Sequence, residues 1–206
     1  MSGNNEDPLL HCKIDPDELE IGDPIGEGSF GTVFEAQFRG ATVAVKTVRV
    51  GRVTEDVVLA FRNEILAIST LRHQNLVFML GACWDGGPDR LALVLEYCGH
   101  GSVQTLVDGS SSGSTPAEQQ QGRANDSGLL PPLEPCWDSP LGEMALGVCR
   151  CVRYLHWDLP VPMLHRDIKP GNVLVTSTLT AKLLDRHLPP TPKQSAVSHQ
   201  YFDDKK

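Results

Sequence analysis

The sequence predicts an α+β protein, with a small antiparallel sheet lobe followed by a mainly helical lobe. Residues 19–48 alternate apolar and polar residues, which is typical of strands. Residues 54–71 repeat apolar residues at helical spacing, and residues 141–156 do so again after a long polar stretch. Strands and one helix therefore come first, and further helices follow.

The composition is ordinary for a globular protein. Of the 206 residues, 40% are hydrophobic and 21% are charged. A net charge of -8 argues against a nucleic-acid partner, because phosphate backbones are bound by clustered Lys and Arg. We expect no membrane insertion, since no stretch is long enough to span a bilayer.

Cysteine usage points to a reducing compartment. None of the six cysteines shows Cys-x-x-Cys spacing, and the N-terminus carries no targeting signal. We therefore expect a cytoplasmic protein. Cys149 lies in the helical pattern of residues 141–155, where we expect a small buried hydrophobic residue.

The first elements follow in order along the chain. Residues 1–17 are polar and rich in Pro, and we expect a flexible lead-in. Three antiparallel strands follow in residues 19–48, with a turn at Arg39 and Gly40. The helix of residues 54–71 begins with acidic residues, which favour the positive end of the helix dipole. Residues 76–83 and 91–97 complete a five-stranded lobe.

The second lobe is predicted to be helical. Ser102 can cap a short helix that ends near Val107. Residues 109–135 are rich in Ser, Gly, Gln and Pro without periodicity, so we expect a mobile insertion. Residues 141–156 form the long helix of this lobe.

A glycine-rich turn follows the first strand. By itself this turn is weak evidence for one kind of ligand site, because dinucleotide-binding units carry glycines at the same spacing. Here Gly31 leads into a β-branched and aromatic strand rather than a helix, so a hairpin folded over a phosphate is the better fit. The predicted phosphate-contacting residues are Gly26, Glu27, Gly28, Ser29, Phe30 and Gly31.

Lys46 lies in the alternating strand after this hairpin, where a cation could neutralise bound phosphates. A strand lysine is usually a solvated charge, but its place after the hairpin favours a phosphate contact. Glu64 shares a helix face with Phe61 and Ile68, and we expect it to pair with Lys46.

Residues 165–172 (His-Arg-Asp-Ile-Lys-Pro-Gly-Asn) are the most informative stretch. Asp167 can orient an attacking hydroxyl, Lys169 can neutralise a transferred phosphoryl group and Asn172 can bind Mg²⁺. We interpret His165 as a packed structural residue rather than a general base. The scattered histidines give no zinc site.

These motifs appear in one order, and residues 19–185 resemble a eukaryotic protein kinase domain of the serine/threonine type, in the tyrosine-kinase-like branch. The resemblance implies a kinase N-lobe over residues 18–98 and a partial C-lobe over residues 99–185. It implies ATP and Mg²⁺ as cofactors and a protein substrate with Ser or Thr. Lys46 paired with Glu64 would face Asp167 across a nucleotide cleft.

The resemblance also assigns roles to single residues. Asp167 would orient the substrate hydroxyl, Lys169 would steady the γ-phosphate, and Asn172 with Asp185 would hold Mg²⁺. Leu95 would lie at the back of the nucleotide pocket. The residues implied to contact adenine are Ile25, Val33, Ala44 and Leu174, with the main chain of Glu96 and Cys98.

The chain departs from the family pattern at Asp185-Arg186-His187, where the family has Asp-Phe-Gly. Residues 186–206 do not resemble the family, so we expect a truncated domain with an exposed apolar face on the helix of residues 141–155.

Three functions stay open: an ATP- and Mg²⁺-dependent serine/threonine kinase, a catalytically inactive nucleotide-binding or scaffold protein, and a marginally folded fragment.

Overall fold

The computed structural model describes residues 7–28, 31–47, 55–84, 91–111 and 140–184. These residues fall into two compact units. Within the described ranges, unit 1 comprises residues 7–72 and 78–97, and unit 2 comprises residues 73–77 and 98–184. No helix in these ranges is both long enough and apolar enough to cross a membrane.

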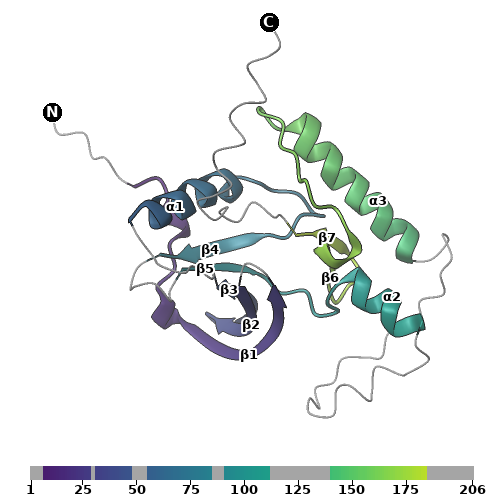
Figure 1. Cartoon of the computed structure of the whole chain (residues 1–206), viewed down its shortest axis with the longest axis horizontal. Coiled ribbons are helices and arrows are strands. Elements are labelled where there is room, and N and C mark those ends of the chain that lie inside the picture. Colours follow the sequence, from purple (N-terminus) through teal and green to yellow (C-terminus); the bar gives the residue numbers. More distant parts are fainter. Residues whose placement is uncertain (1–6, 29–30, 48–54, 85–90, 112–139, 185–206) are drawn as a thin grey trace, which may run out of the picture. The chain divides into compact units, whose positions relative to one another are not determined.

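Unit 1 contains the predicted five-stranded antiparallel sheet, with strand order β1-β2-β3-β5-β4 (Figure 1). The predicted turn after β2 is confirmed, because Arg39 and Gly40 both have positive φ, at 50° and 82°. The strands are β1 Leu19–Gly28, β2 Gly31–Phe38, β3 Ala41–Thr47, β4 Met79–Cys83 and β5 Ala92–Glu96.

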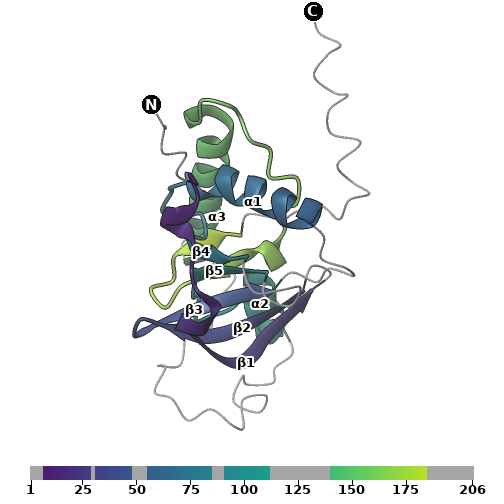
Figure 2. The same ribbon diagram turned by 90° about the vertical axis from the view of Figure 1, so that its left-hand side faces the viewer.

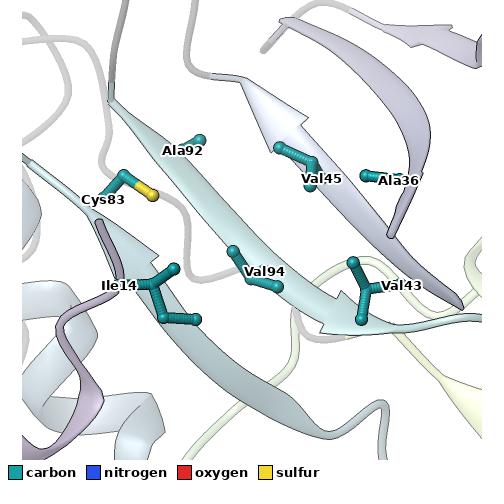
Figure 3. Packing of buried hydrophobic residues seen from close by; sticks show 7 residues of the cluster. All are labelled: Ile14, Ala36, Val43, Val45, Cys83, Ala92 and Val94. Atoms are coloured by element: carbon teal, nitrogen blue, oxygen red, sulfur yellow. The ribbon is translucent and has the colours of Figure 1, made fainter. Parts of the chain in front are cut away.

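One face of this sheet carries an apolar core. Val43 and Val45 of β3 pack with Val94 of β5, and all three are at most 2% exposed. Ile14, from the segment before β1, lies beside these side chains (Figure 3). Burying each such side chain contributes about 1.5–3 kcal/mol, so this cluster is a major source of unit 1 stability. The remaining cluster members are Ala36, Cys83 and Ala92.

The helix α1, Glu55–Ser69, contacts β4 (Figure 2). Its predicted inward face is confirmed, since Phe61 and Ile65 are fully buried and Ile68 is 9% exposed. The guanidinium of Arg72 donates to the carbonyls of Ser69 and Leu71 at 2.7 Å each. Arg72 therefore satisfies carbonyls that the helix end leaves without an intrahelical donor.

The expected flexible lead-in, residues 1–17, differs in the structure from Asp7 onward. Residues 7–18 form two 3-10 turns, Leu10–Cys12 and Pro16–Glu18. Leu9, Cys12 and Ile14 are 3–5% exposed. These apolar side chains are not periodic in the sequence, and their partners, such as β4, lie far along the chain.

The start of β4 also differs from the expected strand over residues 76–83. The N–H of Val77 donates to the carbonyl of Leu183, and the N–H of Leu183 donates to that of Asn75, at 2.9 and 2.8 Å. Residues 73–77 therefore belong to unit 2 and bond to β7 rather than to β5. Period-2 patterns cannot reveal which distant segment supplies the hydrogen bonds.

Unit 2 contains α2 Val103–Ser111, α3 Pro140–Arg153, β6 Val173–Val175 and β7 Ala181–Leu183. The predicted cap of α2 is confirmed, because the Thr105 N–H donates to Ser102 Oγ at 3.2 Å. The predicted long helix is α3, and a π-helical turn at Tyr154–Asp158 continues it. Most of the expected insertion over residues 109–135 lies outside the described residues.

The expected burial of Cys149 was wrong, because this residue is exposed. The buried stripe of α3 consists of Met144, Gly147 and Cys151, and it contacts β7. Cys149 lies about 200° around the helix from Cys151 and so faces away from this stripe. Leu146 of this helix is 44% exposed, and the expected exposed apolar face stays a prediction.

Candidate functional site

Two of the predicted catalytic residues, Asp167 and Lys169, and the predicted Mg²⁺ ligand Asn172 lie close together in unit 2. The side-chain amide of Asn172 donates to the main-chain carbonyl of Asp167 at 2.7 Å, and it also contacts the Asp167 carboxylate. Lys169 Nζ lies 3.3 Å from Asp167 Oδ2. A 3-10 turn, Pro170–Asn172, brings the amide back over this loop, so that one carboxylate, one amide and one ammonium converge.

The backbone of this loop is held in an uncommon conformation. Arg166, directly before Asp167, has φ 63°, a region that residues other than glycine rarely occupy. Such strain persists only where surrounding contacts enforce it, and it is common at functional sites. The conformation turns the chain sharply before the carboxylate.

His165 supplies part of that enforcement. It is 4% exposed, its Nε2 donates to the Leu184 carbonyl at 2.8 Å, and its Nδ1 accepts from the Asp167 N–H at 3.4 Å. Both ring nitrogens are therefore engaged by the main chain. This geometry supports the interpretation of His165 as a packed structural residue.

Leu184 is a site residue that sequence reasoning missed. Its N–H donates to the Asn172 carbonyl at 2.8 Å, and its carbonyl accepts from His165. These bonds fix the chain directly before Asp185, which itself lies outside the described residues. No signal in the residue type could have identified Leu184, because only its backbone is used.

The glycine-rich segment of unit 1 forms the predicted hairpin. Gly26 pairs with Val33, Glu27 with Thr32 and Gly28 with Gly31. Gly31 has φ 147°, a conformation that L side chains rarely adopt. Ser29 and Phe30 lie outside the described residues. The strand that follows Gly31 excludes the helix expected of a dinucleotide-binding turn.

Lys46 shares one face of the sheet with two of the predicted adenine contacts. It pairs with Val33 of β2, while Ala44 lies two residues earlier on β3 and pairs with Leu95 of β5. Directly opposed residues share a face, so all four lie on the side opposite the Val43 and Val45 core. Lys46 is 9% exposed and Leu95 is 8% exposed.

The side chain of Glu64, the predicted partner of Lys46, lies outside the described part of the structure. Its backbone lies in α1, between the buried residues Phe61 and Ile65. The expected Lys46–Glu64 pair therefore stays a prediction.

The remaining predicted nucleotide contacts are divided between the units. Ile25 lies on β1 at an irregular register step and is 41% exposed. Glu96, at the end of β5, accepts from the Phe78 N–H through Oε1 at 2.6 Å. Cys98 and Leu174 belong to unit 2, where the Cys98 carbonyl accepts from the Gly101 N–H at 3.2 Å.

The donor set around Asp167 fits a hard cation. The loop carries two kinds of oxygen donor, the Asp167 carboxylate and the side-chain carbonyl of Asn172. Within the described ranges no three His, Cys, Asp or Glu side chains gather as a metal site. Mg²⁺ does not require such a cage, since it binds through one or two carboxylates, waters and substrate phosphates.

A family model and several known proteins are similar to this chain. A family model described as protein tyrosine and serine/threonine kinase matches residues 19–203. The calmodulin-binding receptor-like cytoplasmic kinase 1 of Arabidopsis thaliana is 34% identical over 162 residues, which cover 78% of this chain and 30% of that protein.

Two further relatives come from other lineages. Mitogen-activated protein kinase kinase kinase 10 of Mus musculus is 32% identical over 79% of this chain and 15% of its own length. The protein named probable serine/threonine-protein kinase drkB of Dictyostelium discoideum is 30% identical over 89% of this chain and 23% of its own length. The chain thus spans less than a third of each of these relatives.

Proposed function

This chain belongs to the protein tyrosine and serine/threonine kinase family, and on that premise we propose that it transfers the γ-phosphoryl group of ATP to serine or threonine hydroxyls of proteins. The arrangement of Asp167, Lys169 and Asn172 on one loop carries this proposal. The lysine two residues after Asp167 favours serine and threonine over tyrosine as acceptors, by resemblance to the serine/threonine form of this loop.

Asp167 would orient the substrate hydroxyl and accept its proton, which then passes to solvent. The hydroxyl oxygen forms a bond to the γ-phosphorus while the bond to the oxygen bridging the β- and γ-phosphorus breaks, and ADP leaves. Lys169 would neutralise charge on the transferred group. Asn172 and Asp185 would hold Mg²⁺, which when bound neutralises phosphate charge.

In unit 1, the hairpin of residues 26–31 would cover the phosphates and Lys46 would contact them. Val33 and Ala44 share the face of Lys46, which supports their role as adenine contacts. Lys46 is mostly buried, and an ammonium so placed is stabilised by a fixed carboxylate. Glu64 is the partner that we propose.

Labelled phosphate transfer from γ-labelled ATP to a mixed protein acceptor tests the proposal. Asp167→Asn keeps the size of the side chain and should lower the rate about a hundredfold or more, because the proton acceptor is lost. Asp108→Asn is the matched control, since Asp108 is an exposed carboxylate on α2 bonded to Gln104. Equal rates for Asp167→Asn and wild type, or labelling of tyrosine alone, would overturn the assignment.

A second candidate, a nucleotide-binding or scaffold protein without turnover, is favoured by one observation. Arg186 and His187 follow Asp185 where the family carries Phe and Gly. A charged Arg costs free energy in apolar packing, and His cannot replace the conformational freedom of Gly. Such a protein should show an ATP-dependent rise in melting temperature without phosphate transfer.

Lys46→Ala should abolish that rise, whereas Lys182→Ala, a strand lysine of unit 2, should retain it. A wild-type chain with no nucleotide-dependent shift would contradict both candidates. We also infer an intracellular location, because ATP is supplied there and all five described cysteines are free thiols.

A further inference from the structure

The segment of residues 7–18, here called the N-terminal strap, precedes the part of the chain that matches the family, residues 19–203. It is fixed along β4. The Ile14 N–H donates to the Ala82 carbonyl at 2.9 Å, and Lys13 forms a parallel bridge with Ala82. A Cβ at Gly81 would lie 2.5 Å from the Cys12 carbonyl oxygen, so the strap packs directly against the strand backbone.

The strap is also bonded to α1. Asp7 Oδ2 accepts from Arg62 Nη2, while Asp7 Oδ1 accepts from the Leu9 N–H at 3.1 Å. The two charged side chains are 28% and 33% exposed, so solvent screens the pair only in part. Arg62 Nε is buried and has no hydrogen-bond partner among the described residues. The ion pair with Asp7 therefore helps to orient this guanidinium.

Trp84 connects the same groups. It directly follows β4 and is 7% exposed. The Arg62 guanidinium carbon lies 5.7 Å from the centroid of its ring, and Lys13 Nζ lies 5.8 Å from it. Both distances are within the range of cation–π attraction. One cation comes from α1 and the other from the strap, so both are held against the end of β4.

Arg62 stands directly after the fully buried Phe61 and two residues before Glu64. Each helical residue turns the side-chain direction by about 100°, so anchoring positions 61 and 62 fixes the direction of position 64. We propose that Arg62, held by Asp7 and Trp84, is a positioning residue that keeps α1 in the rotation in which Glu64 meets Lys46. The strap thereby controls nucleotide affinity. This inference rests on the proposed function.

The test uses the full 206-residue chain and two measurements. Hydrogen exchange of peptides from α1, with α3 as the internal reference, reports whether the helix is held. The Kd for Mg²⁺-ATP, measured well below the melting temperature, reports the consequence. The variants are Asp7→Asn and Arg62→Gln, with Arg62→Lys as the conservative change. Glu18→Gln is the matched control, because it removes the Arg39–Glu18 ion pair from the same strap without touching α1.

Asp7→Asn and Arg62→Gln should speed exchange in α1 but not in α3, and should raise the Kd about fivefold. Arg62→Lys should retain most of the affinity, and Glu18→Gln should match wild type. Unchanged α1 exchange in Asp7→Asn, or faster exchange with an unchanged Kd, would overturn the positioning role. If wild type binds no ATP, the proposed function and the positioning role both fall, while the exchange data still show separately whether the strap holds α1.

Discussion

The side-chain amide of Asn172 donates a hydrogen bond to the main-chain carbonyl of Asp167 over 2.7 Å. The same nitrogen contacts the Asp167 carboxylate, so one amide controls both the backbone and the side chain of the proposed catalytic residue. Asn172 therefore links the proposed Mg²⁺ site to Asp167, the residue proposed to orient the substrate hydroxyl.

Asn172→Ala should therefore lower the rate of phosphate transfer by about a hundredfold and raise the Mg²⁺ concentration needed for half-maximal rate. A Mg²⁺ titration of the rate checks both effects. Gln104→Ala is the matched control, because Gln104 donates to Asp108 on the exposed side of α2. An unchanged Mg²⁺ requirement in Asn172→Ala would remove Asn172 from the proposed cation site.

His165→Ala should destabilise the protein rather than abolish chemistry. Two hydrogen bonds to the main chain and a buried ring are lost, so the free energy of unfolding should fall by about 3 kcal/mol. Urea unfolding measures this loss, and His11→Ala, on an exposed turn, should show little change. A pH–rate profile that loses one limb, at unchanged stability, would instead identify His165 as a base.

Gly147→Ala should destabilise the chain although alanine favours helices. A Cβ at Gly147 would lie 2.5 Å from Asn75 Nδ2, which is held by a bond to the Ala181 carbonyl. The clash should lower the free energy of unfolding by about 1–3 kcal/mol, despite a gain in helix propensity of about 1 kcal/mol. Gly171→Ala meets open space and should be close to neutral. A more stable Gly147→Ala protein would show that Asn75 can move.

Thiol alkylation at neutral pH should modify Cys149 well before Cys12 and Cys83. Cys149 is exposed, whereas burial raises the pKa of Cys12 and raises the pKa of Cys83 to about 11. The thiolate is the reactive form, so both buried thiols should react slowly. Mass spectrometry of the native protein over time gives the order, and unfolding in urea should make the three rates similar. Equal rates in the native state would contradict the described burial.

Much of the local structure could be predicted from sequence, because local patterns determine it. The hairpin at Gly31, the turn at Arg39 and the Ser102 cap each depend on residues within a few positions. The inward face of α1 follows from helical spacing alone. The order of Lys46, Asp167 and Asn172 predicted the family, and the family model confirms it.

Other features required partners that are distant in sequence. Nothing in residues 7–18 indicates that Asp7 meets Arg62, and nothing in residues 73–77 indicates that their hydrogen bonds go to β7. Cys149 lies in an apolar pattern, yet the stripe that β7 covers runs through Gly147 and Cys151 instead.

Most strands and helices, and the identity of the chemical groups, were thus predictable from neighbours along the chain, although β4 begins at Met79 rather than Leu76. The fold had to be known to see which face of α3 is buried, which backbone groups hold Asp167 and which segment contacts α1. Burial and hydrogen bonding are satisfied by whichever segment folding brings near, and that segment can be distant in sequence, since Ala181 and Asn75 are 106 residues apart.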